Sequence, residues 1–181
     1  MFKKKEKIVC PMYGAGVLED IVKEKIDGKN VELYKLKLAH SQMELYIPTN
    51  MSEKNGLRKI SSKSVFTRAI KVLKEELVKP SDEDMRRIAT ELSEVIKKST
   101  VKECALWLSK LLYRRRNSGQ LNTNEKKLFL SFKLLLCGEL SLIKDIDYKE
   151  SEKQFDKIIK KNNKLTEEDI SFFGFDEFED E

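Results

Sequence analysis

The first sixty residues alternate short apolar stretches with turn residues. Gly14 and Gly16 permit a tight bend or a close approach of the backbone, and Asp-Gly-Lys at 27–29 is a hairpin signal. Pro11 and Pro48 end two of the apolar stretches. Strands are expected at residues 6–10, 17–25, 31–38, 43–47 and 56–60. Turns at this spacing predict a small β-barrel or curled sheet.

After residue 61 the pattern changes, because apolar residues now recur every three or four positions and predict amphipathic helices. The apolar stripes lie at residues 65–77, 88–96, 101–112, 128–136 and 155–159. Helix starts are expected at Ser81, at Ser99 or Thr100, at Asn122 and near Asp147. Ser81 with Asp84 and Asn122 with Glu125 have the spacing of capping boxes, and Gly119 suits a left-handed helix end.

A run of strands followed by a run of helices predicts an α+β fold with two units rather than an interleaved α/β sheet. We expect a β module at residues 1–61 and an all-helical module at residues 62–164. Residues 165–181 form a third, acidic segment.

Charge is distributed unevenly between these parts. The formal net charge is +5, and residues 165–181 hold eight acidic residues with no Lys or Arg, which leaves +13 on residues 1–164. A charge of this size on residues 1–164 is typical of a protein that binds nucleic acid. A solvated surface whose charge is balanced by the acidic tail explains it equally well. The tail, which also holds four phenylalanines, either folds back on the basic helices as a DNA mimic or serves as a solubility element.

Three features limit the class of protein. Cys10, Cys104 and Cys137 are too scattered for a zinc site or a disulfide framework, so we expect reduced, buried thiols. No run of about 18 apolar residues exists that would span a membrane. The lysines at the N-terminus are not followed by the apolar stretch of a secretory signal. A cytoplasmic protein without a membrane partner is expected.

Candidate catalytic residues are scarce. His40 is the single histidine and suits a surface loop better than acid–base catalysis. Acidic pairs such as Glu75-Glu76 lie among lysines and arginines, as solvated surface residues do. The metal-binding and phosphate-binding motifs of common enzymes do not occur. We therefore expect no catalytic activity and no cofactor.

Basic residues cluster at the predicted helix ends. Cations at 114–116, in the last turn of a helix, complement its dipole and need no further explanation. Arg86-Arg87 and Lys126-Lys127 lie near helix N-termini, where cations are slightly unfavourable. A phosphate backbone would account for them, which makes them candidates for DNA contact. Trp107, the single tryptophan, is expected to pack at the edge of the core.

Two blocks of the chain resemble the CarD/CdnL family of bacterial transcription regulators. Residues 9–17, V-C-P-M-Y-G-A-G-V, resemble the family's opening "VVYP-x-x-G-x-G". The segments that follow it in the family's order lie at 34–36, 43–48 and 56–58. Residues 112–128 resemble the helical segment "LWRR…GLS-x-x-EK-x-(L/M)", and residues 135–140, L-L-C-G-E-L, resemble "IL-x-GEL". The resemblance covers about residues 1–160.

The resemblance implies a Tudor-like N-terminal module, similar to one in transcription-repair coupling factor. This module would bind the β subunit of RNA polymerase by strand pairing at a sheet edge. The helical module would contact upstream promoter DNA weakly and without sequence preference, and the two together would stabilise the open promoter complex. A monomer is expected.

Site residues follow from the alignment with the family. The polymerase contacts fall on Glu24, Lys25, Ile26, Glu44, Leu45 and Tyr46. The DNA contacts fall on Met85, Arg86, Arg87, Arg115, Lys126 and Lys127. Family members often carry Arg where this chain has Glu24 and Tyr46. The family's tryptophan wedge aligns with Asp84, so the neighbouring Met85 is the candidate apolar wedge.

A second hypothesis is an architectural DNA-binding protein that acts without polymerase and coats or bends duplex DNA. Tight binding to duplex DNA alone would favour it. A nuclease or other enzyme is disfavoured by the lack of a metal-carboxylate or histidine constellation.

Overall fold

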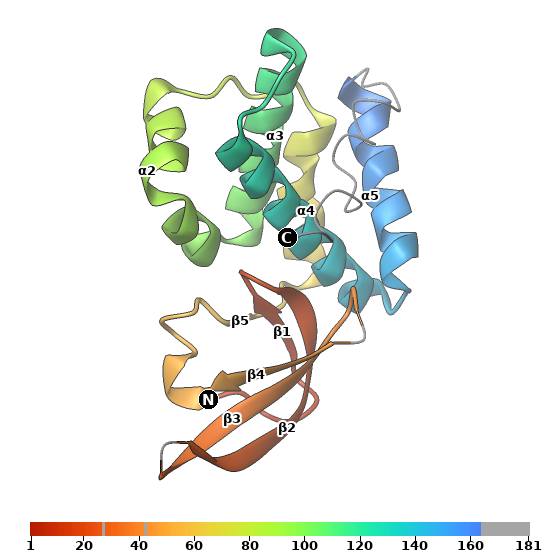
Figure 1. Cartoon of the computed structure of the whole chain (residues 1–181). Helices are drawn as coiled ribbons and strands as arrows, with labels where there is room; N and C mark the ends of the chain where they lie inside the picture. The colour runs from red at the N-terminus through yellow and green to blue at the C-terminus, as the bar shows by residue number, and fades with distance from the viewer. Residues whose placement is uncertain (27, 42, 164–181) are drawn as a thin grey trace.

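The computed structural model describes residues 1–26, 28–41 and 43–163. A β-sheet forms one end of the molecule and a group of helices forms the other (Figure 1). This order of strands and then helices confirms the predicted α+β class. The acidic segment 165–181 lies outside the described residues.

The sheet contains five antiparallel strands in the order β4-β3-β2-β1-β5. They are β1 (Lys7–Cys10), β2 (Gly14–Ile26), β3 (Lys29–Leu38), β4 (Glu44–Pro48) and β5 (Arg58–Lys59), with a 3-10 turn η1 (Thr49–Met51). The expected hairpin is present, with Ile26 opposite Lys29. Gly16 is required by a close approach, since a Cβ there would lie 2.4 Å from the Lys37 carbonyl oxygen.

The helical module starts with a short helix rather than a long one. Its elements are α1 (Lys63–Ala69), the 3-10 helix η2 (Ile70–Lys74), α2 (Asp82–Lys98), α3 (Val101–Ser118), α4 (Thr123–Lys144) and α5 (Tyr148–Asn163). The prediction of one helix over 65–77 is wrong, because Glu75 is extended (φ −101°, ψ −173°). Leu77 is nevertheless buried at the end of the stripe, so a buried residue in an irregular segment had continued the helical spacing of apolar residues.

The predicted helix ends are confirmed where side chains cap the backbone. Ser81, Thr100 and Asn122 each form a capping box with the residue three positions later. Gly119 ends α3 with a positive φ of 74°, and its N–H donates to the Arg115 carbonyl. Such caps depend on near neighbours in the sequence, which is why they could be predicted.

Helix α4 packs across the sheet and joins the two modules. Gly138 lies so close to the sheet that a Cβ there would be 3.1 Å from the Ala15 Cβ. Val9 and Ala15 accordingly belong to the same buried cluster as the helices. A second cluster fills the sheet itself, around Tyr34 and Leu36.

The boundary between the modules also contains a buried ion pair. Arg58 of β5 donates two hydrogen bonds to Glu139 of α4, at 3.1 and 2.9 Å. The Glu139 side chain is fully buried, and the Ser61 backbone N–H donates to it as well. At the other side of the boundary, Gly56 approaches the Lys97 carbonyl at the end of α2. Contacts at both places hold the sheet and helices in one arrangement.

Within the part of the chain that the structure describes, no helix is long and apolar enough to cross a membrane. Cys10, Cys104 and Cys137 are free and buried, as expected.

Candidate binding surfaces

Strand β4 forms one edge of the sheet. It pairs with β3 from Lys37 opposite Glu44 to Leu33 opposite Pro48, and among the described residues no strand pairs with its other side. A strand in this position offers backbone N–H and C=O groups to another chain. Three of the predicted polymerase-contact residues, Glu44, Leu45 and Tyr46, lie on this strand.

A groove of about 340 Å³ adjoins the free edge. Leu45 and Tyr46 line it together with Met12 and Tyr13 from the turn between β1 and β2, and Lys97 closes it from the helical side. Met12, Tyr13 and Tyr46 are 46, 49 and 43% exposed, which is unusual for such large apolar side chains. Sequence reasoning missed Met12 and Tyr13, although their place after Pro11 in a turn was a signal of exposure.

The hairpin tip lies farther along the same sheet. Glu24, Lys25 and Ile26 are all exposed at the end of β2. Glu24 pairs with Val31, a position beyond the Pro48 end of β4. The six predicted polymerase-contact residues therefore form two adjacent patches, the tip and the β4 edge, rather than one continuous strand.

The predicted DNA-contact cations of the helical module lie on three helix ends that point away from the sheet. These are the start of α2, the end of α3 and the start of α4 (Figure 1). Two ion pairs connect them: Asp84 Oδ1 lies 2.7 Å from Lys110 Nζ, and Arg114 Nε lies 2.6 Å from Glu125 Oε1. The structure thus brings Arg86, Arg87, Arg115, Lys126 and Lys127 to one end of the molecule.

Several of these cations have acidic neighbours. Arg86 pairs with Glu83 in the first turn of α2, and Arg87 Nε lies 3.9 Å from Glu91 Oε2. Local pairs of this kind offset the unfavourable position near a helix N-terminus. Arg86 and Arg87 therefore have a structural explanation besides the phosphate contact that the sequence made a candidate. Lys127 is exposed, and Arg115 and Lys126 are half-buried.

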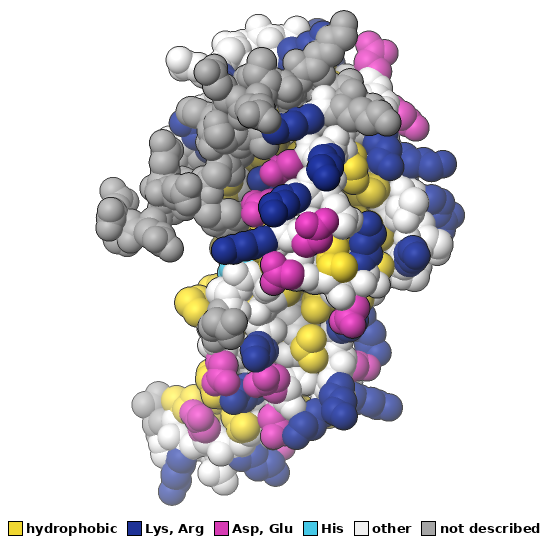
Figure 2. All heavy atoms as spheres, turned by 90° about the vertical axis from the view of Figure 1, so that its right-hand side faces the viewer, with side chains coloured by type: hydrophobic (Ala, Val, Ile, Leu, Met, Phe, Trp, Pro, Cys, Tyr) yellow, Lys and Arg dark blue, Asp and Glu magenta, His cyan; other side chains and the backbone are white. Residues whose placement is uncertain are grey.

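The face that carries α5 has a different character. Basic and acidic side chains alternate across it, over both modules (Figure 2). Mixed charge of this kind produces little net attraction for a polyanion. The far end of the helices is the better candidate for contact with nucleic acid.

Two family models match this chain. Residues 2–61 match the family model described as CarD-like/TRCF RID domain. Residues 51–156, more than half of the chain, match the model described as CarD, C-terminal domain. This chain belongs to the CarD family. The chain is also 26% identical over 155 residues to "Putative transcription factor YdeB" of Bacillus subtilis (strain 168), covering 83% of this chain and 97% of that protein.

This CarD-family transcription factor has a polar network where the resemblance places a tryptophan. Asp84 accepts hydrogen bonds from the Ser81 backbone and hydroxyl and pairs with Lys110. The Lys110 ammonium lies 4.8 Å from the centre of the Trp107 ring. Burial alone would raise the pKa of Asp84, but the bonds from Lys110 and Ser81 outweigh it and lower the pKa. Asp84 is therefore an ionised structural residue of α2.

The two large apolar side chains near this network, Met85 and Trp107, are not exposed enough to insert into DNA as they stand. Met85 is half-buried and packs against the helical core. Trp107 is only 6% exposed, which confirms a packing role and places it deeper than the core edge. A wedge formed by Met85 would require its side chain to leave this packing.

The remaining reactive side chains are poorly placed for chemistry. His40 is half-buried rather than on an open loop, with its ring centre 5.9 Å from that of Tyr148, and burial lowers its pKa. Burial also raises the pKa of Cys10 to about 11 and that of Cys104 to about 12, so neither thiol ionises readily. Among the described residues, no three His, Cys, Asp or Glu side chains form a group that could hold a metal.

Proposed function

We propose that this CarD-family factor binds the β subunit of RNA polymerase through the β4 edge and hairpin tip. The observation that carries the proposal is the free β4 strand beside a groove of exposed aromatic and methionine side chains. A partner strand paired to β4 would extend the sheet, and its side chains would enter the groove. The match of residues 2–61 to the CarD-like/TRCF RID model supports a role of this module in polymerase binding.

The helical module, in this proposal, contacts upstream promoter DNA with the cations at its far end. These contacts would be made to phosphates, so DNA binding would be weak, sequence-independent and sensitive to salt. The residues that make them would be Arg86, Arg87, Arg115, Lys126 and Lys127. Docking on polymerase raises the local concentration of the module near DNA and compensates for this weakness. The joint effect would be to stabilise the open promoter complex.

The protein would act as a monomer in the cytoplasm and by binding alone, without catalysis or a cofactor. The high pKa values of Cys10 and Cys104 and the packing of His40 against Tyr148 support the proposed lack of catalysis.

A binding experiment with the β-subunit lobe tests the first part. Wild type should co-elute with the lobe, and Lys25→Glu at the exposed hairpin tip should weaken the complex by about tenfold. Lys153→Glu on α5, an equal change of charge on an exposed residue, should leave it unchanged. Absence of binding by wild type at low salt, together with tight binding to duplex DNA alone, would favour the architectural DNA-binding hypothesis instead.

A further inference from the structure

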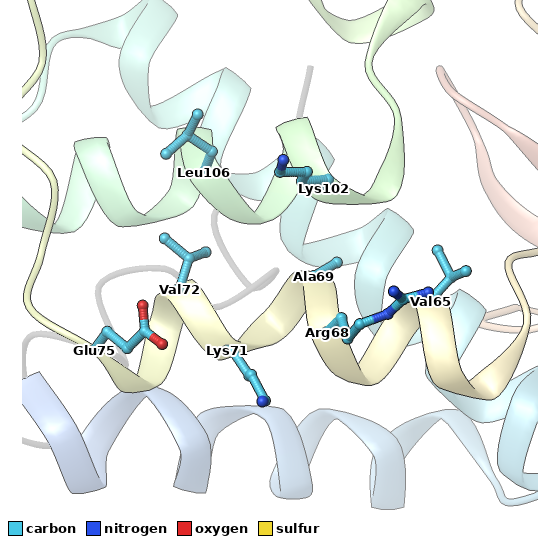
Figure 3. A pocket seen from close by; sticks show the side chains of 8 residues that line it. All are labelled: Val65, Arg68, Ala69, Lys71, Val72, Glu75, Lys102 and Leu106. Atoms are coloured by element: carbon cyan, nitrogen blue, oxygen red, sulfur yellow. The ribbon is translucent and has the colours of Figure 1, made fainter.

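A second groove lies on the helical module, away from both surfaces described above. It has a volume of about 530 Å³ and runs between α3 and the segment formed by α1 and η2 (Figure 3). Val72 and Leu106 face each other across it, and Val65, 41% exposed, lies at one end. The groove is within the size range of sites that hold small ligands or peptide side chains.

Three cations lie at the margin of this apolar floor, and Lys71 points from η2 toward α5 (Figure 3). Arg68, Lys71 and Lys102 line the groove, together with a single acid, Glu75. None of the three forms an ion pair with another described residue, in contrast to Arg86, Arg87 and Arg114. An apolar groove with unpaired cations on its rim fits a ligand that is both aromatic and anionic.

We propose that the groove binds the acidic segment 165–181 of the same chain. Phenylalanine side chains of the segment would rest on the floor, and its carboxylates would pair with Arg68, Lys71 and Lys102. The composition of the segment matches, with four phenylalanines, eight acids and no Lys or Arg. The two sets of groups are complementary in charge and in hydrophobicity.

The chain can reach the groove. Helix α5 packs beside η2 and ends at Asn163, and Figure 3 shows it on the opposite side of α1 and η2 from α3. Eighteen residues follow Asn163. An extended chain of that length spans about 60 Å, enough to pass η2 and enter the groove. Attachment to α5 keeps the segment at a high effective concentration, so each contact can be weak.

A smaller groove of about 220 Å³ is the alternative place on the same module. It carries Lys63, Lys74 and Lys144, but its floor is formed largely by side chains that are already buried, such as Phe66 and Ile70. Phenylalanine would gain little contact there. The larger groove is therefore the assigned site, and the lysines of the smaller one serve as an internal comparison.

Zero-length carbodiimide cross-linking of the full chain tests the proposal with native residues. The reagent joins a lysine amine to a carboxylate in contact with it, so Lys71 and Lys102 should be linked to acids of residues 165–181. An equal mixture of 14N- and 15N-labelled chains, mapped by mass spectrometry, should show same-isotope links. Links between a 14N and a 15N chain would overturn the proposal, because the segment would then bind a second copy of the protein. Links mainly to Lys63, Lys74 or Lys144 would show that the segment binds the smaller groove instead.

Matched variants separate specific binding from general attraction. Arg68→Glu, at an exposed position, should lower the yield of links to Lys71 and Lys102 by about fivefold. Arg116→Glu, an exposed arginine at the end of α3, should leave the yield unchanged. Replacing Phe172 and Phe173 by Ser should also lower the yield, since the aromatic contacts are part of the site. Equal yields in wild type, Arg68→Glu and the phenylalanine variant would overturn the proposal.

Discussion

The two candidate surfaces of this protein differ in how they can bind a partner. The β4 edge offers backbone groups and exposed apolar side chains such as Tyr13 and Tyr46, whereas the far end of the helices offers guanidinium and ammonium groups. Strand pairing and apolar burial depend little on ionic strength, but phosphate contacts weaken steeply with salt. The sheet is therefore suited to anchoring and the helices to a weaker contact that depends on ionic strength.

Both surfaces depend on the boundary between the modules, which keeps them at opposite ends of one body. This boundary is built on Gly138 against Ala15 and on the buried pair of Arg58 with Glu139. Changes there should alter both surfaces at once, and changes at one surface should leave the other intact.

The largest effect is expected for Glu139→Ala. The substitution leaves the Arg58 guanidinium and the Ser61 N–H without their buried acceptor, and it should lower the free energy of unfolding by about 3 kcal/mol. Chemical denaturation measures this loss. Glu6→Ala is the matched control, because Glu6 pairs with Lys59, the neighbour of Arg58 in β5, in a much more exposed ion pair. The loss of unfolding free energy in this variant should be much smaller. Equal losses for the two variants would contradict the account of the boundary.

The next effect concerns the sheet edge alone. Tyr46→Asp places a charge in the groove beside β4, and it should weaken binding to the β-subunit lobe by about tenfold while leaving DNA binding unchanged. Tyr46→Phe keeps the ring and removes only the hydrogen bond to Glu44, so it should bind as wild type does. Titration of each variant with the purified lobe provides the measurement. Wild-type affinity in Tyr46→Asp would place the polymerase contact elsewhere.

A third effect concerns the helical end alone. Replacing Arg86 and Arg87 by Glu should reduce affinity for duplex DNA about tenfold and lower the slope of log K against log salt by about 2, as the loss of two phosphate contacts requires. Lys153→Glu with Lys157→Glu on α5 carries the same change in charge and should alter neither quantity. Fluorescence anisotropy at several salt concentrations distinguishes the outcomes. An unchanged slope would mean that Arg86 and Arg87 do not contact phosphates and serve only to pair with Glu83 and Glu91.

The smallest effect is at Asp84. Because its pKa is lowered in the folded state, the ionised carboxylate stabilises the fold above its ordinary pKa, and this contribution is lost as pH falls through the lowered value. Asp84→Asn should therefore cost about 1 kcal/mol at neutral pH, where the pair with Lys110 is intact, and little in strong acid. Thermal unfolding of both proteins across the acidic range measures the difference. A cost that does not change with pH would contradict an ionic role.

The parts of the fold that could be predicted are those set by local sequence. Capping residues such as Ser81 and Asn122, and Gly119 at a helix end, act on neighbours within a few positions. The prediction of one helix over 65–77 was wrong because Leu77 is buried in an irregular segment, and burial alone does not specify backbone geometry. Tertiary contacts, rather than local sequence, set the backbone conformation of this segment.

The candidate sites could be predicted from the sequence less completely than the fold. The residues of β4 and of the helix ends could be named from the resemblance, but their neighbours could not. Met12 and Tyr13 join Tyr46 only through the curvature of the sheet, and Arg58 meets Glu139 across 81 positions of sequence. Pairing of Asp84 with Lys110 likewise depends on how α2 and α3 both pack against α4.

The central claim is that the two surfaces act together on RNA polymerase at a promoter. The most direct test is the lifetime of the open complex on a housekeeping promoter, measured with wild type, with Tyr46→Asp and with the Arg86 and Arg87 charge reversals. Wild type should lengthen the lifetime, and either set of substitutions should remove most of this effect. A lifetime that stays fully extended with Tyr46→Asp and with the arginine reversals would contradict it.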